Sequence, residues 1–211
     1  MDPSWEFWTH DPHATSRGRP GTLAAVPIWL TEDEHQLLTT ALDAVLPGDD
    51  LTPGAGAAGG ADYVDQVLGA FAFDPPRIWA GGPFSGRRGG AAGFDGWLEL
   101  GAAEELAWRI RLEGSDGRPE REFNGAVVGW QQLYRDGLGQ LAAGTALADT
   151  PSQWRDLLFR HACESLYGDP VYGGNRNGAG WVAIGFDGDV QPRGWTDDEV
   201  TRPVELEIRP S

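Results

Sequence analysis

The sequence is poor in cysteine, in basic charge and in long apolar runs. Its 211 residues include one cysteine, Cys163, which excludes an internal disulfide, a Cys-x-x-Cys redox or haem-attachment pair and a cysteine-rich metal site. No stretch reaches the roughly 20 consecutive apolar residues of a membrane-spanning helix. These absences exclude a redox centre built from cysteines and a membrane span.

Basic side chains are outnumbered by acidic ones. All 16 are arginine and face 32 aspartates and glutamates, so the formal net charge is −16. Phosphate contacts need clustered Lys and Arg, so we do not expect nucleic acid as a partner. The first thirty residues also lack the basic stretch and the apolar run of about 7–15 residues that form an export leader. We therefore expect a cytoplasmic protein, or a periplasmic or exported one if a leader has been removed.

The chain is long enough to bury a core of its own, because at this length roughly 70% of the unfolded surface disappears on folding. Composition divides it into an extended aromatic arm (1–30), a helical domain (31–188) and an extended tail (189–211). The expected fold class is all-α: a single helical domain of about five helices with long loops rich in Gly and Trp. Residues 204–208 alternate like a strand without a partner.

Apolar periodicity and capping residues predict the helices. Thr31 and Glu34 form a capping box for a first helix, and Asp62 is the expected N-cap of a second. In the fifth, Thr150 is the expected N-cap, with Pro151 in the first turn and Gln153 completing a capping box. The predicted helices cover residues 31–46, 62–71, 102–112, about 125–141 and 150–167.

The helix predicted at 102–112 has an expected inward face made of Ala103, Leu106, Ala107 and Ile110. Long glycine-rich loops are expected at 78–93 and 172–180. Structureless loops of this length are uncommon in compact domains, and such loops usually bind something.

No convincing catalytic motif is present. The segment 54–59 satisfies G-x-G-x-x-G, but it follows a helix rather than a strand, so we interpret it as a flexible loop. His10 and His13 lack the rigid frame that a zinc site needs. His35 is expected on a solvated face, and Cys163 is expected to be buried beside a partly exposed His161.

Other catalytic chemistry is equally unsupported. Ser165 is not in a nucleophile-elbow motif, and neighbouring acids such as Glu104 and Glu105 are expected on solvated faces. The residues alone therefore predict no catalytic set and no bound cofactor or metal.

Tryptophan is abundant, with ten residues. Trp is enriched at interface hot spots because it buries a large, rigid area at small entropic cost. We favour an interface role for the set, against the alternative that the indoles pack beneath the long loops. Those in predicted loops or arms are Trp5, Trp8, Trp79, Trp97, Trp181 and Trp195.

Two segments near the C-terminus resemble a known family. Residues 169–175 read Asp-Pro-Val-Tyr-Gly-Gly-Asn and residues 180–186 read Gly-Trp-Val-Ala-Ile-Gly-Phe. They resemble the signature of the gluconate 2-dehydrogenase subunit 3 family, with Phe186 in place of the usual tyrosine. Residues 45–47, 53–55 and 62–65 resemble its N-terminal half, so the resemblance covers roughly 31–188.

The resemblance implies a non-catalytic small subunit in a heteromer with a flavoprotein large subunit. That partner would be of the glucose-methanol-choline type, would bind FAD, and would oxidise a sugar, sugar acid or glycoside. Many relatives carry a twin-arginine leader that is not visible here, which favours a cytoplasmic complex. The small subunit is expected to stabilise the partner and to help shape its active-site entrance.

The candidate site residues belong either to the partner interface or to structural loops. Gly173 and Gly174 can adopt backbone angles closed to other residues, and the side chain of Asn175 can satisfy turn amides. A structural role is favoured for these three, and both roles stay open for Tyr172 and Trp181. The full set is Trp79, Phe84, Tyr172, Gly173, Gly174, Asn175, Trp181 and Trp195.

Two alternatives come from other functional classes. A stand-alone carbohydrate-binding module could stack Trp79, Trp181 and Trp195 on sugar rings. An independent hydrolase or lyase would need mid-chain carboxylates brought together in space.

Overall fold

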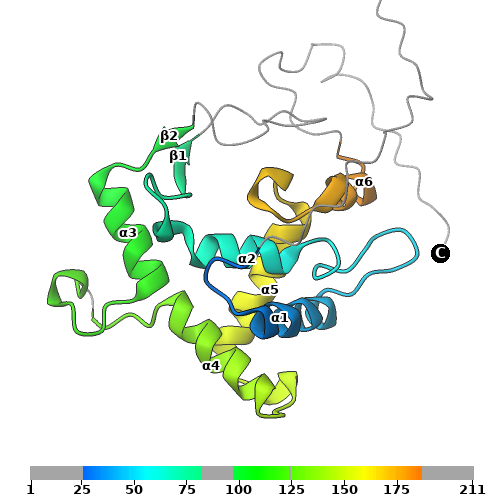
Figure 1. Ribbon diagram of the computed structural model, residues 1–211, viewed down its shortest axis with the longest axis horizontal. Helices are drawn as coiled ribbons and strands as arrows, with labels where there is room; N and C mark the ends of the chain where they lie inside the picture. The colour runs from blue at the N-terminus through cyan, green and yellow to red at the C-terminus, as the bar shows by residue number, and fades with distance from the viewer. Residues whose placement is uncertain (1–25, 82–96, 124, 187–211) are drawn as a thin grey trace, which may run out of the picture.

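The computed structural model describes residues 26–81, 97–123 and 125–186, whose arrangement is shown in Figure 1. These residues form six α-helices and one two-stranded antiparallel sheet, so the prediction of an all-α fold is confirmed. The helices are α1 (Glu32–Val45), α2 (Gly60–Leu68), α3 (Ala102–Glu113), α4 (Trp130–Ala142), α5 (Ser152–Tyr167) and α6 (Ala179–Ala183). The strands are β1 (Trp79–Gly81) and β2 (Leu98–Glu99).

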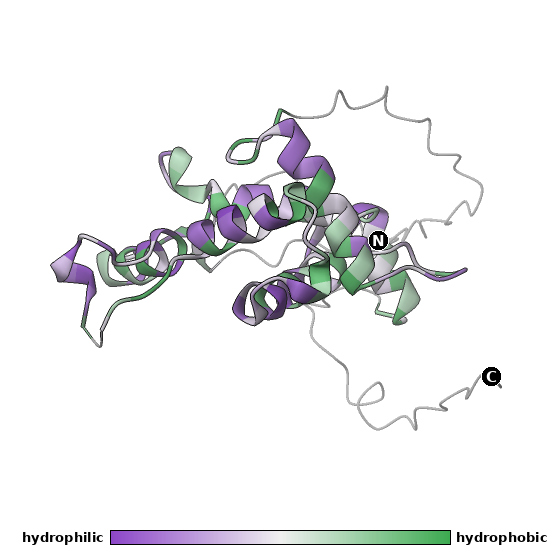
Figure 2. Ribbon diagram, turned by 90° about the horizontal axis from the view of Figure 1, so that it is seen from below, coloured by the Kyte–Doolittle hydropathy of each residue, from purple (hydrophilic) through white to green (hydrophobic). Residues whose placement is uncertain are grey.

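Helix α5 is the centre of the bundle and contacts α1, α2, α4 and α6. Its predicted inner face is buried, from Trp154 through Leu157 and Leu158 to Ala162 and Leu166. Figure 2 shows hydrophobic and hydrophilic residues interspersed along the helices, as expected of amphipathic helices around one core. None of the described helices has the length and apolarity needed to cross a membrane.

Helix α1 begins as the sequence predicts. The Glu34 backbone N–H donates to the Thr31 hydroxyl at 3.2 Å, and the Thr31 N–H donates to the Glu34 carboxylate at 2.8 Å. This reciprocal pair satisfies two amides at a helix end. The capping box is therefore confirmed.

The predicted N-cap of α5, Thr150, is wrong. The Thr150 hydroxyl donates to the carbonyl of Leu147 at 2.7 Å and caps no helical amide, so the flanking residue is Pro151, with no side-chain cap. The 3-10 turn Leu147–Asp149 supplies that carbonyl. The helix begins one residue later than predicted, so Thr150 does not occupy the N-cap position.

The predicted start of α4 is also wrong, by about five residues. Gly125 has a φ of 103°, and Gly129 is extended with φ −71° and ψ 155°, so the helix begins only at Trp130. Gly129 passes so close to Gly114 that a Cβ atom would overlap the Gly114 amide nitrogen. This crossing keeps residues 125–129 outside the helix.

Helix α3 has the predicted bounds but not the predicted burial. Figure 1 shows it beside the bundle, and its main helical contact is α4. Ala103 and Ala107 are exposed, and Leu106 and Ile110 are only partly covered. The prediction that these residues face inward is therefore wrong. Among the described residues, no element covers much of this apolar face.

The last part of the N-terminal arm is fixed to α2 by a carboxylate. Asp65, which is 4% exposed, accepts hydrogen bonds from the backbone amides of Ile28, Trp29 and Leu30 at 2.7–2.9 Å. The guanidinium of Arg135 lies 3.8 Å from the centre of the Trp29 ring. Residues 28–30 therefore belong to the bundle.

Other predictions fall partly or wholly beyond the described ranges. The loop expected at 78–93 is wrong at its start, because Trp79–Gly81 pairs with β2. Predictions for His10, His13, Phe84, Trp195, residues 1–25 of the arm and the strand at 204–208 lie outside the described residues.

Candidate functional site

The Gly-Gly-Asn segment closes the C-terminal part of the fold. Asn175 is completely buried and has the left-handed angles φ 45° and ψ 46°. Its amide group donates to the carbonyl of Gly168, and its side-chain oxygen accepts from the amide of Gly180, both at 2.8 Å. One side chain therefore joins the end of α5 to the start of α6.

The glycines of this segment allow the backbone to lie directly on α5 and α2. A Cβ atom on Gly174 would overlap the carbonyl oxygen of Ser165, and one on Gly173, whose φ is 97°, would overlap the side chain of Gln66. In this chain, Gly173 and Gly174 are therefore needed because a larger side chain would not fit at either position.

Polar contacts fix the same segment to α2. The Arg176 amide donates to the carbonyl of Ala58 at 3.0 Å, and its guanidinium pairs with Asp62. His35 also bonds Asp62, through Nε2 at 2.8 Å. The predictions that Asp62 caps α2 and that His35 is merely solvated are both wrong, because α2 begins two residues before Asp62 and the two side chains are partners.

The glycine-rich segment 54–59 is closely packed, contrary to the interpretation as a flexible loop. A Cβ atom on Gly56 would overlap the carbonyl of Thr39 in α1. The N-cap of α2, Gly59, has Gly173 and Arg176 against it. The start of α2 is thus covered by the chain's own signature segment.

The aromatic candidates lie in two clusters. Trp97 lies 6.4 Å from Trp79 and 5.6 Å from Tyr172, between ring centres. Burial, together with the nearby charge of Asp169, raises the pKa of Tyr172 to about 12. Trp181 donates its indole N–H to the Tyr167 carbonyl at 2.8 Å and contacts Phe186 at 5.3 Å.

The described tryptophans are all buried or partly buried. Exposed apolar area comes instead from aliphatic and phenylalanine side chains that the sequence analysis did not select. Those beyond the N-terminal third are Leu98, Phe123, Val127, Val128, Phe159, Val182, Ile184 and Phe186, each at least 40% exposed.

A buried polar cluster lies between α2, α4 and α5, and the sequence analysis missed it. His161 is 1% exposed; its Nδ1 is hydrogen-bonded to the Tyr134 hydroxyl at 2.8 Å, and its Nε2 has no hydrogen-bond partner among the described residues. Burial, aided by the charge of Arg160, lowers the pKa of His161 to about 3. The nearest carboxylate, Glu164, is 4.0 Å from Nε2 and accepts from the Tyr63 hydroxyl at 2.9 Å.

The predicted exposures of Cys163 and His161 are therefore reversed. Cys163 is partly exposed, and burial together with the charge of Glu164 raises its pKa, which disfavours the thiolate. Ser165 donates to the carbonyl of Ala162 at 2.9 Å. Within the part of the chain that the structure describes, neither residue is paired with a base as a nucleophile would be.

An open pocket of about 380 Å³ lies between α3, residues 127–130 and α5. Its walls are Ala107, Ile110, Arg111, Val127, Val128, Trp130, Leu133, Gln153, Leu157 and Arg160. The two charged residues among these are both arginines. The sequence contained one signal for this site, the apolar periodicity of α3, but gave no indication that the face stays partly uncovered.

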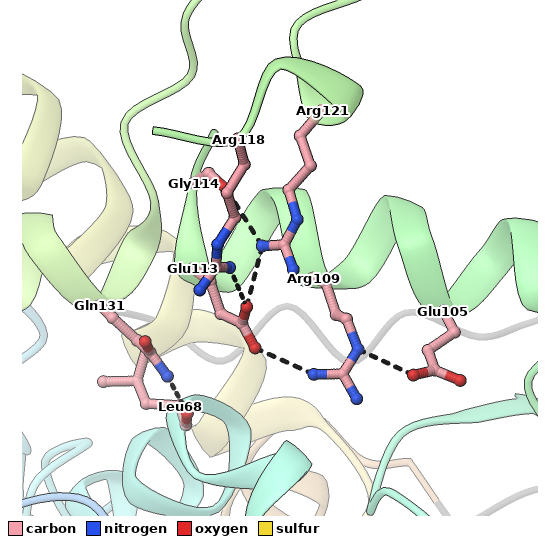
Figure 3. Close-up of polar contacts among 8 residues, drawn as sticks. All are labelled: Leu68, Glu105, Arg109, Glu113, Gly114, Arg118, Arg121 and Gln131. Atoms are coloured by element: carbon pink, nitrogen blue, oxygen red, sulfur yellow. Dashed lines mark hydrogen bonds and ion pairs between the residues drawn. The ribbon is translucent and has the colours of Figure 1, made fainter. Parts of the chain in front are cut away.

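An ionic network around Glu113 holds the segment after α3 (Figure 3). Glu113 accepts from Arg109 at 3.1 Å, Arg118 at 2.5 Å and Arg121 at 2.8 Å. Although burial raises its pKa, the hydrogen bonds from Arg121 and Arg118 outweigh that effect and lower the pKa of Glu113 below 4.5. Val127 is fixed to Ser115 by two hydrogen bonds of 2.8–3.0 Å.

Across residues 26–81, 97–123 and 125–186, no group of three or more His, Cys, Asp or Glu side chains is arranged to hold a metal ion. What the arrangement can do is present a rigid helical surface with exposed apolar side chains and an arginine-containing pocket.

Comparison with known proteins agrees with the signature segments. No curated protein and no solved structure matches the chain significantly. The family model for gluconate 2-dehydrogenase subunit 3 matches residues 32–188, which span α1 to α6 and include the buried Asn175 loop. The chain therefore belongs to the gluconate 2-dehydrogenase subunit 3 family and is a subunit of a dehydrogenase complex.

Proposed function

We propose that the chain is the non-catalytic small subunit of an FAD-dependent dehydrogenase. The large subunit would be a flavoprotein of the glucose-methanol-choline type that binds the FAD and oxidises a sugar, sugar acid or glycoside. The small subunit would stabilise that flavoprotein and help shape its active-site entrance. The observation that carries the proposal is the family match across residues 32–188.

The surface of the chain supports association with another protein. Val182 and Ile184 in and after α6 are 77% and 58% exposed, and Val128 beside α3 is 52% exposed. Exposed apolar side chains of this kind can form part of an interaction site. A permanent heteromeric interface usually buries about 2,000 Å² or more, which is enough to cover several such side chains.

Co-expression tests the proposal. The flavoprotein encoded beside this chain would be produced alone and together with it, and its soluble yield, FAD content and sugar-oxidising activity would be measured. We expect all three to depend on the small subunit. A flavoprotein that is equally soluble and active by itself would contradict the proposal.

A further inference from the structure

The pocket beside α3 combines apolar side chains with Gln153 and two arginines. Trp130 is fixed between Trp108, at 6.1 Å between ring centres, and His161, at 4.8 Å. The guanidinium of Arg111 lies 4.4 Å from the Trp108 ring centre and 5.6 Å from that of Trp130, and the Arg160 guanidinium lies 5.9 Å from Trp130. Two cations therefore flank one indole.

Neither guanidinium has an acidic partner within the described ranges. The ion pairs found there engage other arginines, including Arg109, Arg118, Arg121, Arg135 and Arg176. Arg111 and Arg160 are both exposed, and their guanidinium groups lie over the rings named above. In a chain with a formal net charge of −16, two such arginines at one pocket form a local positive site.

Apolar side chains line the pocket beside Gln153 and the two arginines, and part of this lining is set in place. Val127 and Val128 are 40% and 52% exposed, although the segment that carries them is fixed through Ser115 and the Glu113 network. Ala107 and Ile110 of α3 form the opposite wall. At about 380 Å³ the pocket lies in the lower part of the range of ligand pockets, about 300–1,000 Å³.

We propose that this pocket receives a segment of the large dehydrogenase subunit that presents an apolar side chain next to a carboxylate. The apolar side chain would lie between α3 and Val128, and the carboxylate would pair with Arg111 and Arg160. Charge complementarity selects this occupant, because the rest of the acidic chain repels an acidic segment and this pocket attracts it. The inference rests on the proposed function and adds which surface of the small subunit contacts the large one.

Two variants of the full-length chain test the proposal by affinity for the purified flavoprotein. R111E/R160E reverses the charge of the pocket, and Ala107→Trp fills it. Each is expected to weaken binding at least tenfold. The wild-type affinity is also expected to fall with added salt, and R111E/R160E to lose most of that dependence.

Matched controls separate the pocket from general effects. R77E/R155E makes the same change in net charge with arginines that do not line the pocket, and Ala103→Trp adds an indole one turn earlier on the exposed part of α3. Both controls are expected to bind within about twofold of wild type. Circular dichroism and thermal unfolding would verify that every variant is folded.

The outcomes distinguish this inference from the proposed function. If the wild-type chain does not bind the flavoprotein, the proposed function fails. If wild type binds and both pocket variants bind equally well, the pocket is not the docking site while the proposed function stands. Loss of binding in V182D/I184D, with both pocket variants unaffected, would place the interface at α6 and overturn the inference.

Discussion

Asn175 is the residue on which the closing of the C-terminal segment most depends. Asn175→Ala would remove both of its hydrogen bonds, leave the buried Gly180 amide unpaired and keep an alanine at left-handed angles. We expect a loss of about 3 kcal/mol in the free energy of unfolding. Urea unfolding followed by circular dichroism would measure it.

Asn177 provides the matched control. It also has left-handed angles, with φ 59°, but its side chain is exposed and makes no hydrogen bond among those found in the described chain. Asn177→Ala should therefore report backbone strain alone, about 1 kcal/mol. Equal losses in the two variants would show that the buried hydrogen bonds of Asn175 contribute little.

His161 makes stability depend on pH. Its pKa is about 3 in the folded chain against an ordinary value of 6.5, so between these values the unfolded chain binds more protons than the folded one. Stability from this group is therefore complete above pH 6.5 and is lost as the pH falls. From pH 6.5 to 5 the loss should approach about 2 kcal/mol.

The window from pH 6.5 to 5 isolates the effect of His161, because the carboxylates with lowered pKa values change protonation mainly at lower pH. Although burial raises the pKa of Glu34 and of Glu113, hydrogen bonds from arginines, and for Glu34 also from Thr31, together lower both pKa values. Unfolding of wild type and of His161→Gln would be compared at pH 6.5 and 5, with His35→Gln as the control on a histidine whose side chain is 26% exposed. We expect the His161 variant to lose most of the pH dependence, and an unchanged slope would refute the assignment.

At the residue scale, sequence reasoning identified the signature loop but not the buried polar cluster. The Gly-Gly-Asn pattern indicated a tight turn, and Asn175 does satisfy backbone groups there. The burial of His161 was missed although its spacing indicates it, because it follows Trp154, Leu157 and Leu158 by seven, four and three residues and so shares their buried face. Its polar side chain had argued for exposure. The Tyr134 partner comes from another helix.

At the scale of elements, the contact between α4 and α5 depends on one glycine. Gly137 lies against Trp154 so closely that a Cβ atom would overlap the indole ring. Gly137→Ala should therefore destabilise the chain by about 2 kcal/mol, because overpacking forces side chains and backbone apart. Thermal unfolding would show a lower midpoint.

Gly139 lies two residues further along the same helix, and no atom of the described chain would come within 4 Å of a Cβ atom there. Gly139→Ala should raise stability by up to about 1 kcal/mol, because alanine is the better helix former. If both substitutions changed the midpoint in the same direction, helix propensity rather than packing on Trp154 would dominate.

Elements were predicted more reliably than their ends or partners. The helices around 32–45 and 102–113 lie where apolar periodicity places them. The start of α4 was missed because it depends on the crossing of Gly114 and Gly129, and the start of α5 because a 3-10 turn at Leu147–Asp149 precedes it and moves the N-cap to Pro151. Periodicity likewise revealed the apolar face of α3, but burial depends on which neighbour covers it.

At the scale of the whole molecule, an acidic helical subunit has kept apolar area on its surface. The bundle around α5 is complete, with Trp154, Leu158 and Tyr134 fully enclosed. The face of α3 and the end at α6 are not enclosed by the described residues. Membership of a family of dehydrogenase subunits gives a reason for this difference, because another subunit of such a complex can cover what this chain leaves exposed.

Light scattering coupled to size-exclusion chromatography is the most direct test of the central claim, using the purified full-length chain mixed with its flavoprotein. The account predicts one peak with the mass of a heteromer, and sugar-dependent flavin reduction that requires both chains. Two separate peaks, together with flavin reduction by the large chain alone at an unchanged rate, would contradict it.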